Sequence, residues 1–229
     1  LLINFDYDQN LKLKKSLYKN KNFQTYFKGQ VNFKPFFYFN IFADIKKINF
    51  NNLNMKKKYK LIINEISNKK INGELHLNYL TKNIIHKKNL EANKINFIFK
   101  NGDIISKNSF FKFADLNIKA NFYLKTYPLY KDLDYELLID TQDINKFFKL
   151  VGIKKSRNMK ETNVLVKGKV NLDAQKYYFN KILINKKIIE EKKLIELKDY
   201  FDKNAKDFFY NDLTEKKIYL FLKNLIESI

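Results

Sequence analysis

Short segments in which apolar and polar residues alternate with a period of two dominate the chain. In FKGQVNF (27–33), apolar side chains alternate with Lys28, Gln30 and Asn32, which is typical of a strand with one solvated face. Pro35 then turns the chain, and the next segment alternates again but carries aromatic side chains on the opposite phase as well. Because this second strand is apolar on both faces, it must be covered on both, by protein or by a molecule that the protein carries.

The pattern of the first segment recurs twice. INGELHL (71–77) and VKGKVNL (166–172) repeat its order of apolar, polar, glycine, polar, aliphatic, polar and apolar residues, so that Gly29, Gly73 and Gly168 occupy the same place. A glycine inside a strand marks a bend, a bulge or a close approach of two backbones. The copies are unevenly spaced, so we expect a loose repeat in which neighbouring units complete each other's core.

A weaker copy, FKNGDII (99–105), contains the pair Asn101–Gly102, which predicts a tight turn between two strands. We expect a basic connector at 14–22 and a polar loop at 51–60, while 59–66 fits either a strand or a short helix. Alternation predicts further strands at 1–13, 94–100, 109–118, 119–127, 135–140, 163–173 and 177–185.

Helical spacing of apolar residues occurs in three places. Residues 142–151, with Thr141 as N-cap and Gly152 as stop, predict a helix set in the β chain. Residues 188–205 and 213–229 read as amphipathic helices. The predicted fold class is therefore mainly β: a curled antiparallel sheet or groove of repeated strand pairs, with one embedded helix and C-terminal helices.

The change of character after residue 185 predicts two domains, a β-rich body at 1–185 and a helical C-terminal tail at 186–229. The 229 residues are enough for one large all-β domain or two small ones. The sequence begins at Leu1 and not at methionine, so we expect a piece of a longer protein. No segment approaches the roughly 18 apolar residues that a membrane-spanning helix needs.

The net charge of +21 first suggests nucleic acid. Arg157 is the only arginine, however, and the lysines are scattered over the polar phase of the strands. Proteins that read phosphates and base edges rely on the planar fork of arginine. We therefore interpret the lysines as a solvated face. Cysteine is absent, which excludes disulfides and thiol chemistry in this chain.

Candidate catalytic or metal-binding residues are scarce. His76 lies on the polar phase of its strand and His86 in a lysine-rich connector, and neither has a partner at metal-ligand spacing. The sequence contains no glycine-rich phosphate loop, nucleophile elbow or dinucleotide fingerprint. We expect a protein that is not an enzyme, with no catalytic residue, metal or cofactor.

The run FKGQVNFKPFFYFNIFADIKKINF (27–50) resembles the strand pairs of the AsmA-like envelope proteins. So does the order of the segments that follow, INGELHLNYL, KINFIFKNGDIISKNSFFKFADLNI, DTQDINKFFKLVGI and VLVKGKVNLDAQKYYFNKILINKK. The resemblance covers residues 28–185 and rests on pattern and order, without an invariant motif.

The resemblance implies a C-terminal portion of a bacterial envelope protein, held at the inner membrane by an N-terminal anchor outside this sequence, with its body in the periplasm. It implies a role in phospholipid transport between membranes or in outer-membrane assembly, with phospholipid acyl chains bound in an apolar β-groove. The apolar strand residues that would line this groove are Phe37, Phe39, Ile41, Leu75, Leu77, Ile95, Phe97, Phe122, Val170 and Leu172.

Three alternatives stay open on the residues alone. The same apolar side chains fill a closed sandwich core equally well, because inward-facing strand residues look alike in a groove and a core. The lysines also fit a ribosome-associated protein that binds nucleic acid through phosphates. Finally, the chain fits a passive scaffold that packs against a partner through its C-terminal helices, which the resemblance would make an envelope protein.

Overall fold

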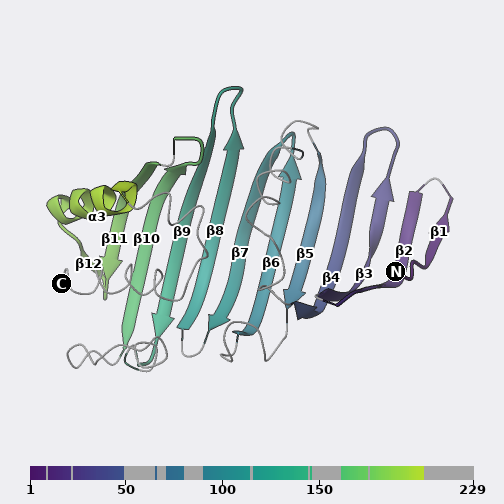
Figure 1. Ribbon diagram of the computed structural model, residues 1–229, viewed down its shortest axis with the longest axis horizontal. Coiled ribbons are helices and arrows are strands. Elements are labelled where there is room, and N and C mark those ends of the chain that lie inside the picture. Colours follow the sequence, from purple (N-terminus) through teal and green to yellow (C-terminus); the bar gives the residue numbers. More distant parts are fainter. Residues whose placement is uncertain are drawn as a thin grey trace. The chain divides into compact units, whose positions relative to one another are not determined.

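The structure is a computed structural model that describes residues 1–8, 10–21, 23–48, 65, 71–79, 90–113, 116–143, 145, 161–174 and 176–203. The fold of these residues is mainly β, as the alternating pattern predicts (Figure 1). The elements are β1 (Phe5–Tyr7), β2 (Asn10–Lys19), β3 (Phe23–Asn32), β4 (Tyr38–Ile48), β5 (Gly73–Tyr79), β6 (Leu90–Lys100), β7 (Asp103–Phe113), β8 (Leu116–Thr126), β9 (Lys131–Thr141), β10 (Thr162–Asn171), β11 (Lys176–Ile184), β12 (Lys187–Ile188) and α3 (Glu191–Lys203).

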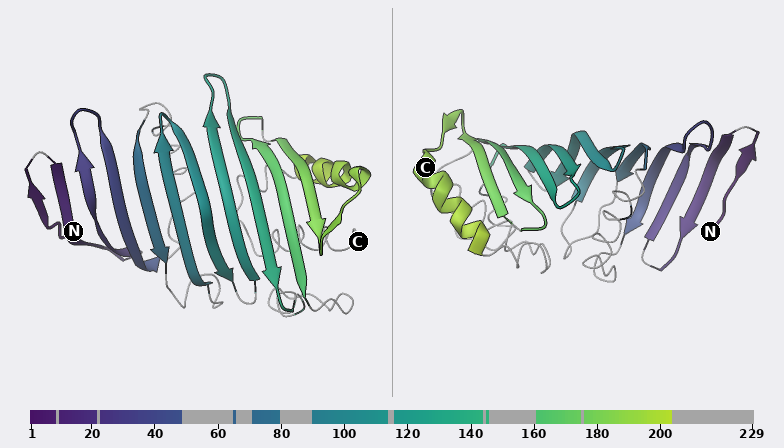
Figure 2. Two further views of the ribbon diagram at one scale, coloured as in Figure 1. Left: turned by 180° about the vertical axis from the view of Figure 1, so that it is seen from behind. Right: turned by 90° about the horizontal axis from the view of Figure 1, so that it is seen from above.

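The chain divides into two compact units, Leu1–Phe113 (unit 1) and Ala114–Ile229 (unit 2). In unit 1, strands β1 to β7 are neighbours in chain order, and all pairs are antiparallel except β4 and β5, which are parallel. In unit 2, β8 to β12 follow each other in antiparallel pairs. Helix α3 lies against β11 (Figure 2), so this part of the predicted tail belongs to the same unit as β8–β12.

Several predicted elements are confirmed. The hinged pair at 27–50 is β3 and β4, joined by a turn that contains a cis Lys34–Pro35 peptide bond. Asn101 and Gly102 form the tight turn between β6 and β7, both with positive φ (52° and 92°). The amphipathic helix expected at 188–205 is α3.

Other predictions lie wholly or largely outside the described residues. They are the connecting segments at 51–60 and 59–66, the embedded helix at 142–151, the last helix at 213–229, and the position of His86.

The basic connector predicted at 14–22 is wrong, because Asn10–Lys19 forms strand β2. Its pairing with β3 changes phase in the middle: Leu13 pairs with Gly29, but the next pair joins Ser16 to Phe27. One extra residue in β2 forms a bulge there, which moves the inward positions from odd to even numbers. Strict period-two alternation is therefore interrupted at Lys14 and Lys15, and for this reason it does not predict the second half of the strand.

The strand predicted at 109–118 is also wrong, because those residues span the end of β7 and the start of β8. A bulge lies in β7, where the pairing moves from Phe97–Ser106 to Lys94–Phe110. Asn108 adopts a positive φ of 53° at this point, a conformation that asparagine tolerates better than most residues. The bulge again breaks the alternation on which the prediction depends.

Two of the repeat glycines lie beneath an aromatic ring of the neighbouring strand. Gly73 pairs with Phe39, and a Cβ atom at Gly73 would lie 2.5–2.6 Å from three atoms of the Phe39 ring. Gly168 pairs with Tyr135, whose hydroxyl would lie 2.5 Å from a Cβ atom at Gly168. Burial raises the pKa of Tyr135. The repeated glycine therefore makes room for a ring that covers the backbone of the next strand.

Backbone approaches also require glycine at two of these positions. A Cβ atom at Gly29 would collide with the carbonyl oxygen of Asn40 on β4, and one at Gly168 with the carbonyl oxygen of Tyr178 on β11. The Gly168 contact lies at a register shift between β10 and β11. The predicted close approach at the repeat glycines is thus confirmed.

Unit 2 has a buried apolar core on one face of its sheet. The cross-strand row of Ile139, Val164 and Ile184 is buried, and so is the row's neighbour Val166. Leu197 of α3 is buried as well, and the backbone N–H of Tyr177 on β11 donates to Asp202 of α3 at 2.8 Å. Helix and sheet therefore close part of this core together.

We expect Gly168→Ala to lower the free energy of unfolding by about 1–3 kcal/mol, because the added methyl meets a backbone oxygen that cannot rotate away. Gly73→Ala should also lower the free energy of unfolding, for two reasons: residues with a side chain rarely adopt its φ of 158°, and the added methyl meets the ring of Phe39. Urea denaturation of both variants measures the difference. In a Phe39→Leu background the Gly73→Ala cost should fall, because the contact with the ring is removed while the backbone strain remains. A cost that does not depend on residue 39 would contradict the proposed packing.

Candidate functional site

The pairing register of unit 1 places the predicted groove residues of β4, β5 and β6 on one face of the sheet. One row joins Ile41, Leu75 and Phe97 across the three strands. The adjacent row joins Ala43, Leu77 and Ile95. We call this side of the sheet the apolar face of unit 1. Six of the predicted groove residues lie on it, namely Phe39, Ile41, Leu75, Leu77, Ile95 and Phe97.

A series of aromatic ring contacts runs along this face. Phe33 contacts Phe37, and Phe37 contacts Phe39, with ring centroids 6.1 Å and 6.2 Å apart. Phe39 then contacts Phe99 on β6 at 5.5 Å, and Phe99 contacts Phe97 at 6.2 Å. All four pairs are tilted, a favourable geometry for aromatic rings. We call this series the ring ladder. It extends the face to Phe37, the seventh predicted residue in unit 1.

Most side chains of the apolar face are only partly removed from solvent, although Ala43 and Phe99 on the same face are buried. Phe39, Ile41, Leu75, Leu77, Ile95 and Phe97 all have intermediate exposure, and Phe37 is 47% exposed. Large apolar side chains of a closed core are more often fully buried, as they are in unit 2. The burial in unit 1 therefore fits a face that retains accessible apolar surface.

Sequence reasoning missed buried polar residues on this face. Ser106 and Ser109 are fully buried beside the β7 bulge, with their hydroxyl oxygens 2.6 Å apart. Asn93 is buried as well, and among the described residues its Oδ1 atom has no hydrogen-bond partner. A buried acceptor without a donor is unfavourable unless water or a bound molecule supplies one. The unusual spacing of the two serines, three residues apart in a strand, was the one available signal.

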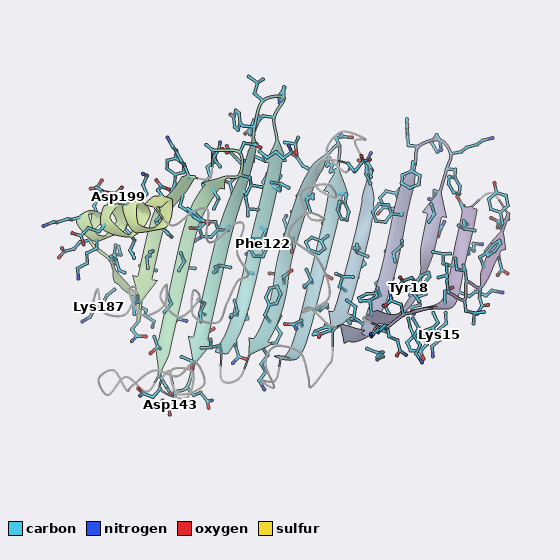
Figure 3. The ribbon with its side chains drawn as sticks, viewed as in Figure 1. Lys15, Tyr18, Phe122, Asp143, Lys187 and Asp199 are labelled. Carbon is cyan, nitrogen blue, oxygen red and sulfur yellow. The ribbon has the colours of Figure 1, made fainter. Side chains whose placement is uncertain are left out.

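The predicted groove residues of unit 2 have different surroundings. Phe122 lies on the apolar phase of β8 (Figure 3), opposite Tyr135 of β9, with intermediate exposure. Val170 is buried in the core of unit 2 and pairs with Leu133. Leu172 follows β10, and its backbone N–H donates to Lys131 at 2.9 Å. Of the predicted groove residues, therefore, only those of unit 1 lie together in adjacent, partly exposed cross-strand rows.

The opposite face of unit 2 is charged and paired. Acidic residues of β9 lie between lysines of β8 and β10: Lys125 binds Asp134 at 3.0 Å and Lys167 binds Glu136 at 2.7 Å. The hydrogen bond to Asp134 raises the pKa of Lys125. This cross-strand charge pairing agrees with the interpretation of these lysines as part of a solvated structural face.

His76 is held by packing and hydrogen bonds on the polar face of β5. Its ring stacks on Phe42 with centroids 4.4 Å apart. The Nδ1 atom lies 3.0 Å from Asn96 Oδ1, and Nε2 lies 3.2 Å from Glu74 Oε2. Glu74 also accepts a hydrogen bond from Tyr38 at 3.1 Å. Through these contacts His76 connects β4, β5 and β6, which is a structural role.

Within the described part of the chain, no group of three or more histidine and acidic side chains is arranged to hold a metal ion. The same residues contain no helix with the length and hydropathy needed to cross a membrane. Comparisons with protein-family models, with curated proteins and with solved structures find no match to this chain.

We expect Asp132→Asn to destabilise unit 2 by about 1.5–3 kcal/mol, the range for hydrogen bonds to a charged group. The Asp132 side chain is only 6% exposed, and it accepts from Lys169 at 2.7 Å and from Asn171 at 3.1 Å. Asp134→Asn is the matched control, because Asp134 lies on the same face of β9 but is 39% exposed. Its cost should stay below about 1 kcal/mol. Equal costs in urea denaturation would contradict the structural role of Asp132.

Proposed function

We propose that the apolar face of unit 1 binds the acyl chains of phospholipids, and that the chain is a non-enzymatic carrier of the AsmA-like type. The observation that carries this proposal is the register of β4, β5 and β6, which brings the predicted residues into adjacent rows. Their partial exposure supports it, because a lipid-binding face must hold apolar side chains that a ligand can reach.

The energetics favour such binding. Each lipid methylene that leaves water contributes about 0.8 kcal/mol, so even part of an acyl chain would bind with useful affinity. A row of aromatic and branched side chains gives many such contacts without directional bonds. The face would therefore accept chains of different length and allow them to slide, which suits transport better than storage.

In this proposal the protein works in the bacterial periplasm, attached to the inner membrane through a segment outside this sequence. It would move phospholipid between membranes or support assembly of the outer membrane. The proposed partners are phospholipid acyl chains and an envelope protein at the C-terminal helices. The exposed Ile195 on α3 (54%) favours that second contact. No metal, cofactor or catalytic residue has a part in it.

Nucleic-acid binding is the less favoured alternative. Lysines on the polar face of unit 2 are engaged by acidic residues of β9, so a phosphate would have to compete with these carboxylates. A steep fall of RNA binding with rising salt would favour this alternative.

The proposal is tested by native mass spectrometry of the purified protein, which should show bound phospholipid. Phe39→Glu places a carboxylate in the ring ladder and should reduce the lipid-bound fraction at least about tenfold, because several lost methylene contacts exceed 1.4 kcal/mol. Phe42→Glu is the matched control on the opposite face of the same strand, and it should retain lipid.

Because a charge in a closed core unfolds a domain, circular dichroism must accompany the measurement. Leu75→Gln gives a milder version that should fold and still lose lipid. A parent protein without any lipid, together with an unfolded Phe39→Glu variant, would contradict lipid carriage and favour a closed core.

A further inference from the structure

The turn between β3 and β4 exposes an unusual concentration of aromatic side chains. All six residues from 33 to 38 are exposed, and four of them are aromatic. Phe36 is 79% exposed, Phe33 50% and Phe37 47%. We call residues 33–38 the aromatic tip; it lies at the end of the hairpin formed by β3 and β4 (Figure 1).

Two of the other turns show that a strand connection does not need such residues, whereas the β8–β9 turn of unit 2 also exposes Tyr127, Leu129 and Tyr130. The β6–β7 turn uses Asn101 and Gly102, and the β11–β12 turn uses Asn185 and Lys186. These are ordinary polar turn residues. Four exposed aromatic rings in one short turn leave apolar surface in water, which indicates a surface that contacts something else.

The aromatic tip is continuous with the apolar face of unit 1. Phe33 and Phe37 belong to the tip, and both are members of the ring ladder. From Phe37 the ladder continues through Phe39 to Phe99 and Phe97 in the interior of the face. An apolar path therefore leads from an exposed turn to the proposed lipid-binding rows without a polar residue between the rings.

We propose that the aromatic tip inserts into the interfacial region of a phospholipid bilayer and that acyl chains pass between bilayer and protein at this point. Aromatic side chains partition well into the membrane interface. Lys34 lies within the tip and Lys100 ends β6, and the chain as a whole carries a net charge of +21. Both match the negative surface of anionic lipids, which selects a bilayer over an apolar protein surface.

This inference rests on the proposed function, because it assigns a place for lipid exchange to the same apolar face. The membrane contact and the proposed lipid carriage can nevertheless be tested separately. Membrane contact by the tip is measured on vesicles, whereas lipid carriage is measured on the purified protein in the absence of vesicles.

The natural chain contains no tryptophan, so a single introduced indole reports on its own position. In Phe36→Trp, emission should shift to shorter wavelength on addition of vesicles of phosphatidylcholine and phosphatidylglycerol, and brominated lipid should quench it. Ile195→Trp on the exposed side of α3 is the control and should respond to neither. Vesicles of phosphatidylcholine alone should give a weaker response, because they lack the negative surface.

A second variant measures the contribution of the tip. Phe36→Ser should weaken partitioning into the same vesicles about tenfold in a flotation assay, while Ile195→Ser should leave it unchanged. Since Phe36 is largely exposed, its replacement should leave the fold and its circular dichroism intact.

Three outcomes would overturn the inference. They are an indole at residue 36 that stays in water on vesicles, a Phe36→Ser variant that partitions like the parent, and an emission shift that depends on protein concentration without vesicles. The last result would assign the tip to self-association or a protein partner. If the parent still carries phospholipid in native mass spectrometry in any of these cases, only the exchange site is wrong and the proposed function stands.

Discussion

The pairing register of β4, β5 and β6 is the constraint on which the apolar face of unit 1 depends. Successive side chains of a strand point to opposite faces, so a slip of one residue would move every apolar side chain of a strand to the polar side. Gly73 fixes this register locally, because the ring of Phe39 fits only over a residue without a side chain. On the opposite face His76 of β5 connects the same strands, through its ring stacking on Phe42 of β4 and its hydrogen bond with Asn96 of β6.

Period-two alternation predicts the fold class and the hairpin at Pro35 because neither depends on long-range contacts. The close packing at the repeat glycines can also be predicted from the sequence, since a glycine inside a strand implies a close neighbour. Alternation fails at bulges, where one extra residue changes the phase. The strand that contains Ser16 and the strand that contains Ser109 are the two cases, and in both the residue after the bulge is a buried serine that reads as polar and exposed.

The candidate site is predictable in its membership but not in its assembly. Ile41, Leu75 and Phe97 each stand on the apolar phase of a strand, yet only the pairing shows that they form one row. The parallel pairing of β4 and β5 has no local signal in the sequence. Val170 has the same sequence pattern as Leu75, but it lies in the buried core of unit 2. Burial depends on what the rest of the fold places over a face, which a strand's own pattern does not encode.

Site-specific photo-crosslinking along β5 tests the central claim most directly, because neighbouring residues of one strand sample both faces. A photoreactive amino acid is placed at Leu75 or Leu77 on the apolar face, and at Glu74, His76 or Asn78 on the polar face. Irradiation in cells, followed by mass spectrometry of the lipid adducts, should give phospholipid crosslinks at the first two positions and none at the other three. Crosslinks to lipid on both faces alike, or on neither, would contradict the account.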